Sequence, residues 1–221
     1  MMRETRLTAA PFVPAPFMPE AEIAHLEHVY SGAGVILEYG SGGSTELGAR
    51  MPGKYIMSVE SDRDWARSLR RKLCGPEILS PTVVHHVDIG RTGHWGRPLD
   101  AHAWRRFHTY PNEVWEQGWF RHPDVVLIDG RFRTACFATV MLRAERPVRV
   151  LFDDYGVRLL YHQVEDFLRP ARMIGRMAEF HVEPGRIDPR KAGLLISQFF
   201  QGSIQGMTEE DYQLRPEDLG W

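Results

Sequence analysis

The stretch Val35–Thr45, with the letters VILEYGSGGST, decides the fold. An apolar run ends in an acidic residue, a glycine turn follows, and polar residues suited to a helix start come next. About twenty residues after Gly40, the run Tyr55–Glu60 ends in a second carboxylate. Two parallel strands of this kind present their carboxyl ends at one edge of a sheet, where doubly wound α/β folds bind ligands. The pattern therefore predicts a nucleotide-type site at this edge.

The glycines of this turn argue against a dinucleotide ligand. The fingerprint G-x-G-x-x-G uses its third glycine for close helix–strand packing and holds the pyrophosphate at the helix N-terminus. Gly40 and Gly42 fit this spacing, but Thr45 stands where the third glycine belongs. Glu38 also carries a negative charge that repels a phosphate brought to the turn. A ligand that lacks phosphate and carries positive charge, such as S-adenosylmethionine (SAM), suits the turn better.

The order E-x-G-x-G-G-S, followed by an acid at the end of the next strand, resembles motif I and the second strand of class I SAM-dependent methyltransferases. The resemblance implies that Glu60 holds the ribose hydroxyls and that Asp88, after the third strand, accepts a hydrogen bond from the adenine amino group. Glu38 is expected to orient the turn and the methionine end. The full set of expected cofactor-binding residues is Glu38, Gly40, Ser41, Gly42, Ser44, Glu60, Ser61, Asp88, Ile89 and Asp129.

Apolar periodicity along the rest of the chain predicts alternating strands and helices. The pattern indicates an α/β, Rossmann-like, doubly wound and mostly parallel sheet of seven strands, the last antiparallel. Five strand–helix units followed by a strand pair match the methyltransferase plan rather than the six-stranded dehydrogenase plan. Strands are expected at 35–39, 55–60, 82–88, 123–130, 148–152, 176–182 and 194–200, and helices at 20–30, 44–50, 63–73, 132–143 and 159–168.

Three further segments complete the predicted organisation. Residues 1–19 are expected to form a proline-rich arm, 20–202 the methyltransferase-like domain, and 203–221 an acidic tail. An insertion at 90–121 holds four of the six tryptophans and is predicted to be a lid or a substrate pocket. Within it, His94 is a candidate general base, although a loop histidine is more often plain surface.

A second group of acidic residues ends the fourth and fifth strands, in Ile128-Asp129-Gly130 and Phe152-Asp153-Asp154-Tyr155. This pattern resembles metal-dependent O-methyltransferases of the catechol and macrocin types. The resemblance implies that Asp129, Asp153 and Asp154 bind a divalent cation such as Mg²⁺ and that Asp129 is catalytic. Such a metal lowers the pKa of a substrate hydroxyl, so that its oxygen attacks the sulfonium methyl group.

This chain departs from the macrocin pattern at Arg131-Phe132-Arg133, where that family has an acidic and aromatic stretch. Two guanidinium groups beside three carboxylates can neutralise them without a metal. Alternatively, Arg131 clamps an anionic substrate. The sequence leaves the metal, the charge pairing and the clamp open.

Composition bounds the function without naming a substrate. The chain has 221 residues, 43% hydrophobic and 25% charged, which is typical of a globular domain. A net charge of −2 gives no general attraction to nucleic acid or anionic membranes. No apolar run is long enough to span a membrane, no signal peptide is evident, and two cysteines favour a reduced, cytoplasmic setting.

The sequence therefore predicts a SAM-dependent methyltransferase acting on a hydroxyl of a small molecule, and a homodimer is left open. One alternative is a SAM-binding, methyltransferase-like module without methyl transfer, which the arginines after the fourth strand favour. An NAD-dependent reductase is a weaker alternative, because Thr45 and Glu38 argue against it and no Tyr-x-x-x-Lys pair is present.

Overall fold

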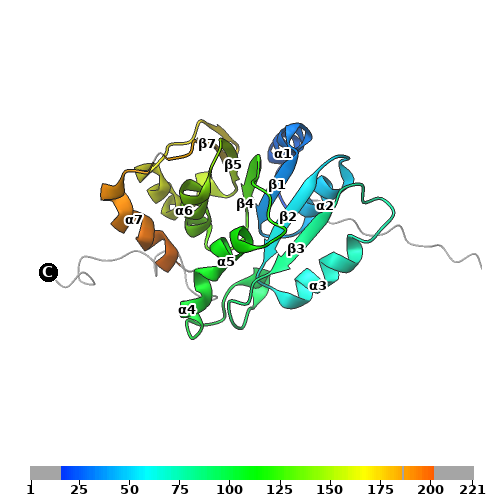
Figure 1. The fold of residues 1–221 in the computed structure, drawn as a ribbon, viewed down its shortest axis with the longest axis horizontal. Coiled ribbons are helices and arrows are strands. Elements are labelled where there is room, and N and C mark those ends of the chain that lie inside the picture. The colour runs from blue at the N-terminus through cyan, green and yellow to red at the C-terminus, as the bar shows by residue number, and fades with distance from the viewer. Residues whose placement is uncertain (1–15, 186, 202–221) are drawn as a thin grey trace, which may run out of the picture.

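The structure is a computed structural model that describes residues 16–185 and 187–201 (Figure 1). Most of the predicted arm, residues 1–15, and the predicted acidic tail at 203–221 lie outside the described residues. Over the part of the chain that is described, no helix combines the length and the apolar character needed to cross a membrane.

Seven strands in the described residues form one sheet in the order β3-β2-β1-β4-β5-β7-β6 (Figure 1). The first five strands pair in parallel, whereas β7 is antiparallel to both β5 and β6. This order confirms the predicted Rossmann-like sheet with an antiparallel last strand. The strands are β1 (Val35–Tyr39), β2 (Tyr55–Glu60), β3 (Thr82–His86), β4 (Val125–Ile128), β5 (Val148–Phe152), β6 (Arg172–Ile174) and β7 (Met177–Val182).

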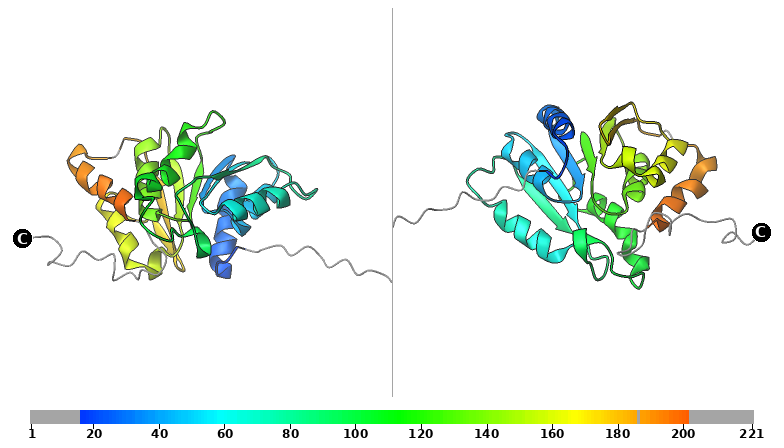
Figure 2. Two further views of the ribbon diagram at one scale, coloured as in Figure 1. Left: turned by 90° about the horizontal axis from the view of Figure 1, so that it is seen from below. Right: turned by 180° about the vertical axis from the view of Figure 1, so that it is seen from behind.

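Helices cover both faces of the sheet (Figure 2). The α-helices of the described residues are α1 (Glu20–Gly32), α2 (Gly43–Arg50), α3 (Arg63–Lys72), α4 (Trp104–Phe107), α5 (Thr109–Asn112), α6 (Arg133–Arg143) and α7 (Ala192–Ser197). Short 3₁₀ helices join them, namely η1 (His94–Gly96), η2 (Glu113–Glu116), η3 (Tyr155–Val157), η4 (Leu159–Asp166), η5 (Pro189–Lys191) and η6 (Gln198–Phe200).

Alternation of side chains along β1 sends successive residues to opposite faces of the sheet. Ile36 packs with Leu26 and Tyr30 of α1 in one apolar core. Leu37 and Tyr39 belong to a second, larger core that includes side chains of α5 and α6. Glu38 shares the phase of Ile36, so it points toward α1 and α2 rather than into the larger core.

Two predicted elements near the C-terminal end of the domain are wrong. The stretch 194–200 forms α7 and η6 instead of a strand. Its inward residues, Leu195 and Gln198, are three apart, which is a helical spacing, and Asp188 caps the preceding turn by accepting the N–H of Arg190. The second strand of the antiparallel pair is β6, which precedes β7 and has too few residues to show an alternating pattern. The helix expected at 159–168 is the tighter η4, with no side chain capping its start.

The aromatic insertion between β3 and β4 forms η1, α4, α5 and η2 rather than one loop. Tyr110 and Trp115 are buried in the larger core, and Trp119 packs against it. Trp95 and Trp104 are exposed. The insertion is therefore in large part an extension of the core, and its predicted role as a lid or a substrate pocket stays a prediction.

Candidate functional site

The turn after β1 packs backbone against backbone onto the turn after β4. Gly40 has a φ of 101°, a conformation that favours glycine. A Cβ atom at Gly40 would lie 2.7 Å from the backbone nitrogen of Gly130, and one at Gly130 would clash with the hydroxyl of Tyr110. That hydroxyl donates to the carbonyl of Val59 at 3.3 Å and accepts the N–H of Arg131 at 3.4 Å. The carboxyl ends of β1, β2 and β4 are thus fixed against one another. We call the edge of the sheet formed by the carboxyl ends of its parallel strands, β5 included, the rim.

Glu38 is fully buried beneath the rim. Its carboxylate accepts a hydrogen bond from the Tyr30 hydroxyl of α1 at 2.7 Å and another from the Thr45 hydroxyl of α2. Burial raises the pKa of Glu38, and these hydrogen bonds oppose the shift. The side chain ties both helices to β1, which agrees with its predicted role in orienting the turn. A direct contact with the methionine end stays a prediction.

Glu60 lies at the end of β2 and is held by backbone N–H groups. Its Oε1 accepts the N–H of Ser61 at 2.7 Å and that of Asp62 at 2.8 Å, while Oε2 has a long contact of 3.4 Å with the N–H of Ser41. The side chain is 7% exposed, and burial raises its pKa. Ser41 is also fixed through its own hydroxyl, which lies 2.6 Å from that of Ser58.

The insertion reaches back over Glu60 through η1. The Ser61 hydroxyl donates to the carbonyl of Gly96 at 2.8 Å. A Cβ atom at Gly96 would lie 2.5 Å from that hydroxyl oxygen and 3.1 Å from Oε1 of Glu60. Two other predicted cofactor residues begin α2: a Cβ at Gly42 would meet no atom within 4 Å, and Ser44 is buried.

Asp88 and Ile89 follow β3. The Asp88 side chain is exposed, accepts the N–H of Gly90 at 2.9 Å and pairs with Arg106 of α4. The N–H of Gly90 is the main cause that lowers the pKa of Asp88, and the charge of Arg106 adds to it. Ile89 is fully buried in the larger core, which leaves a backbone contact as its predicted role.

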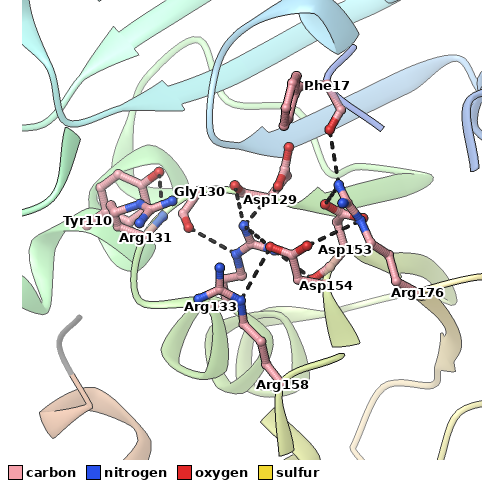
Figure 3. Close-up of polar contacts among 10 residues, drawn as sticks. All are labelled: Phe17, Tyr110, Asp129, Gly130, Arg131, Arg133, Asp153, Asp154, Arg158 and Arg176. Atoms are coloured by element: carbon pink, nitrogen blue, oxygen red, sulfur yellow. Dashed lines mark hydrogen bonds and ion pairs between the residues drawn. The ribbon is translucent and has the colours of Figure 1, made fainter. Parts of the chain in front are cut away.

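Three carboxylates meet at the ends of β4 and β5, as the sequence predicts. Carboxylate oxygens of Asp129, Asp153 and Asp154 all lie within 4.8 Å of one another. We call these residues the rim carboxylates (Figure 3). Partial burial raises the pKa of Asp129 to about 7; Arg133 opposes the shift and the other two carboxylates add to it.

Arginines neutralise the rim carboxylates (Figure 3). Arg133 contacts Asp129 at 2.9 Å and Asp154 at 3.3 Å. Arg176, in the turn between β6 and β7, binds both oxygens of Asp153 at 3.1 and 3.0 Å, and also contacts Asp154 at 3.2 Å. Arg158 lies 3.5 Å from Asp154. Three arginines are therefore the counter-ions of three carboxyl groups.

This donor set does not fit a resident divalent cation while those pairs are in place. Mg²⁺ needs carboxylate oxygens with free lone pairs and a net negative site. Here guanidinium groups already engage the three side chains, and Arg133 also donates to the backbone carbonyls of Asp129 and Asp153 at 3.0 and 2.6 Å. The predicted metal site stays a prediction that requires the arginines to move.

The identity of the neutralising arginines differs from the expected one. Arg133 takes part, but Arg131 does not pair with the rim carboxylates. Phe132 between them has a left-handed φ of 51° and a buried ring, 5.0 Å from that of Phe107 and 5.6 Å from that of Tyr110. This turn sends the two guanidinium groups in different directions.

Sequence reasoning missed Arg158, which follows Asp154 by only four residues, and Arg176, which lies far from the motifs along the chain. Arg176 reaches Asp153 only because β7 folds back antiparallel beside β5. It also donates to the carbonyl of Phe17 at 3.0 Å. Three adjacent carboxylates require cationic partners, and this was the signal available in the sequence. It does not identify which arginines supply the charge.

His94, the candidate general base, lies in η1 with an exposed side chain. Its ring meets that of Trp95 edge-on at 5.1 Å. Trp95, Phe132 and Asp154 are the non-glycine residues with positive φ in the described residues; Trp95 lies in η1, and Phe132 and Asp154 lie in the turns after β4 and β5. Such backbone strain clusters at functional sites. A catalytic role for His94 stays a prediction.

Comparison with known proteins places this geometry in a family. The chain is similar to a methyltransferase-like protein from Silicibacter pomeroyi, with 48% identity and a TM-score of 0.78 over 84% of this chain and 96% of that one. An O-methyltransferase from Bacillus cereus in complex with S-adenosylhomocysteine (SAH) is 15% identical, with a TM-score of 0.46 over 76% and 82%. An RNA methyltransferase from Salinibacter ruber in complex with SAH is 12% identical, with a TM-score of 0.44 over 78% and 96%.

The last two similarities are too distant to carry an activity over. No protein-family model matches the chain, and no curated protein matches it. The similarity to the Silicibacter protein spans nearly the whole of that protein. The chain belongs to the methyltransferase-like family of that protein.

Proposed function

We propose that the protein transfers the methyl group of SAM to a hydroxyl group of a small molecule and that Asp129 accepts the hydroxyl proton. The observation that carries this proposal is the accessibility of Asp129. Its side chain is 35% exposed, compared with 1% for Asp153 and 15% for Asp154. Asp129 also directly precedes Gly130, whose backbone packs on Gly40. The carboxylate therefore lies beside the turn expected to hold the cofactor.

The rim beside β1 and β2 fits SAM. Oε2 of Glu60 has only its long contact with Ser41 among the described residues, so it can accept hydrogen bonds from the ribose hydroxyls. The open space at Gly42 allows a ligand to approach the backbone. Within the described ranges, neither Glu38 nor Glu60 has a cationic partner, which suits a ligand that carries positive charge.

When bound, SAM supplies a methyl group on a positively charged sulfur, which becomes neutral as the methyl group leaves. Asp129 takes the proton that the acceptor hydroxyl loses. Arg133 keeps this carboxylate in place by donating to Oδ1 at 2.9 Å and to the Asp129 carbonyl at 3.0 Å. Asp153 and Asp154 hold the arginines, so they position the site and do not take the proton.

A second candidate is a SAM-binding module that does not methylate. Arginine pairing of all three rim carboxylates favours it, because Asp129 must share its charge with Arg133. The two candidates differ in whether a loaded protein turns over.

Calorimetric titration of the full chain with SAM, SAH and NAD tests the cofactor. We expect saturable binding of SAM and SAH and no binding of NAD. The loaded protein is then assayed for SAH formation with a panel of hydroxylated small molecules. Asp129→Asn should keep its SAH affinity and lower turnover at least about 100-fold, whereas Asp100→Asn, in the insertion, should keep both. No SAH binding contradicts the proposal, and SAH binding without turnover across the panel favours the binding module.

A further inference from the structure

Two arginines near the rim lack the carboxylate partner that the chain gives its other shielded arginines. Arg97 and Arg131 are both partly buried, and the Nε atom of each is buried with no hydrogen-bond partner. Neither forms an ion pair within the described residues. All other described arginines that are not exposed pair with an aspartate or a glutamate, and these are Arg50, Arg133, Arg143, Arg149, Arg158 and Arg176.

Arg131 follows Gly130 directly after β4. Figure 3 shows it beside Tyr110, on the other side of the turn from the rim carboxylates. Its backbone N–H donates to the Tyr110 hydroxyl at 3.4 Å, which fixes the start of the side chain. The left-handed conformation of Phe132 keeps the Arg131 guanidinium apart from that of Arg133. As a result, Arg131 does not pair with the rim carboxylates, although Asp129 lies only two residues away along the chain.

Arg97 comes to the same region from the insertion. It follows Gly96, whose carbonyl accepts the Ser61 hydroxyl next to Glu60. Burial lowers the pKa of Arg131, and the positive charges of Arg133 and Arg97 add to that shift. Contacts of the backbone bring both residues to the carboxyl end of β2. Gly96, next to Arg97, accepts a hydrogen bond from Ser61, and Tyr110, which binds the N–H of Arg131, donates to the carbonyl of Val59.

A shielded guanidinium without a counter-ion is unfavourable, because water is partly removed and no opposite charge replaces it. Two such groups near each other add repulsion to that cost. A single anion between them removes both penalties. The planar fork of a guanidinium also matches the geometry of a carboxylate or a phosphate, which it binds through two parallel hydrogen bonds.

We propose that Arg97 and Arg131 together bind an anionic group, a carboxylate or a phosphate, on the molecule whose hydroxyl is methylated. This inference rests on the proposed function and narrows its substrate to a hydroxylated acid or a hydroxylated phosphate ester. The anionic group lies on the Arg131 side of the turn after β4, and the hydroxyl lies on the Asp129 side. The two arginines then select the substrate and orient it, while Asp129 takes the proton.

Nuclear magnetic resonance of the full chain with ¹⁵N-labelled arginine tests the anion site, since each arginine Nε–H gives its own signal. The SAH-loaded protein is titrated with inorganic phosphate and, separately, with benzoate, at constant ionic strength. We expect saturable shifts of the Arg97 and Arg131 signals with at least one anion. Arg131→Gln and Arg97→Gln should each weaken this binding at least about tenfold. Arg105→Gln, an exposed arginine of the same insertion, is the matched control and should leave it unchanged.

The SAH affinity of each variant is measured in the same samples and should equal that of the wild type. If Arg131→Gln does not fold, Arg131→Lys keeps the charge and should still lose affinity because it lacks the fork. Saturation by phosphate alone points to a phosphate ester, and saturation by benzoate alone points to a carboxylic acid. Shifts that rise linearly with both anions, or that persist in both glutamine variants, overturn the anion site. If the wild type binds no SAH but still binds an anion saturably, the proposed function is overturned and the anion site is not.

Discussion

The acidic residues in the two halves of the rim have different kinds of partner. Beside β1 and β2, hydroxyl and backbone N–H groups surround Glu38 and Glu60, and neither has an ion pair within the described residues. Beside β4 and β5, arginines pair with each of the rim carboxylates. The first half thus has no counter-ion for its carboxylates within the described residues, whereas the second half has three arginines for its three carboxylates.

This difference supports the proposal that one sheet edge holds two unlike ligands. The half without counter-ions suits a cofactor with positive charge and hydroxyl donors. The half with arginine counter-ions, with the unpaired Arg97 and Arg131 nearby, suits the proposed substrate that carries an anion. The family resemblance to metal-dependent O-methyltransferases describes only the positions of the acids, and the partners of those acids set the charge.

Removing Arg133 should have the largest effect on this contrast. Arg133→Gln leaves Asp129 and Asp154 with less counter-charge, so we expect the free energy of unfolding to fall by about 3–5 kcal/mol. Urea denaturation measures the loss, with the exposed Arg105→Gln as control. Added Mg²⁺ should raise the melting temperature of Arg133→Gln and not that of the wild type. Equal Mg²⁺ responses in both would contradict a site balanced by arginine.

The close packing of Gly40 in one half of the rim against Gly130 in the other predicts the next largest effect on the free energy of unfolding. Gly40→Ala places a Cβ against the backbone of Gly130 and forces alanine to a φ of 101°, so we expect a loss of about 3 kcal/mol in unfolding free energy. Gly53→Ala also has positive φ but open space around the new Cβ, so it should cost about 1 kcal/mol. Similar losses for both variants in thermal melts would show that the packing contributes little.

Glu60→Gln probes the negative half without changing side-chain shape. Loss of the charged acceptor should lower SAH affinity about 10–100-fold by calorimetry, because hydrogen bonds to charged groups contribute about 1.5–3 kcal/mol. Asp64→Asn removes a charge nearby on α3, from a side chain that is 90% exposed. It should leave SAH affinity unchanged. Unchanged affinity in Glu60→Gln as well would remove Glu60 from the ribose site.

A carboxylate away from the rim shows how much ion pairs contribute to the free energy of unfolding where no ligand is expected. Glu179 on β7 is buried and meets His25, Arg149, Arg172 and His181. Burial acts to raise its pKa, but hydrogen bonds from His181, Arg172 and His25 outweigh this and lower it to about 2. Because the folded-state pKa is lowered, the stabilisation is present above pH about 4.5 and is lost as pH falls toward 2.

Glu179→Gln should therefore lower the free energy of unfolding by about 2 kcal/mol at pH 7. It should also flatten the acid dependence of stability between pH 4.5 and 2, measured by urea denaturation across that range. SAH affinity should not change. A drop in SAH affinity would show that this cluster is coupled to the rim.

Metal removal should have the smallest effect. With Arg133, Arg158 and Arg176 in place, EDTA should change the initial rate of SAH formation less than about twofold. The Asp153→Asn and Asp154→Asn variants then serve to locate any dependence that is seen. A rate that vanishes with EDTA and returns with Mg²⁺ would mean that the arginines leave the rim carboxylates during catalysis.

The sequence predicted most of the sheet because its strands are long apolar runs that end in turn residues. β1, β2 and β5 agree with their predicted bounds. It failed at β6 and at 194–200, where short segments carry too little periodicity to separate a strand from a helix. In such segments, contacts with distant elements decide the conformation.

The sequence by itself determined which residues end the parallel strands, and hence that Glu60, Asp129, Asp153 and Asp154 share one edge. Strand direction and the side-chain period of two are local properties, so the sequence contains them. Only the tertiary structure decided the charge of each half of that edge. It depends on Arg176 arriving from the turn before an antiparallel strand, on Arg97 arriving from the insertion, and on the left-handed turn at Phe132 that separates Arg131 from Arg133.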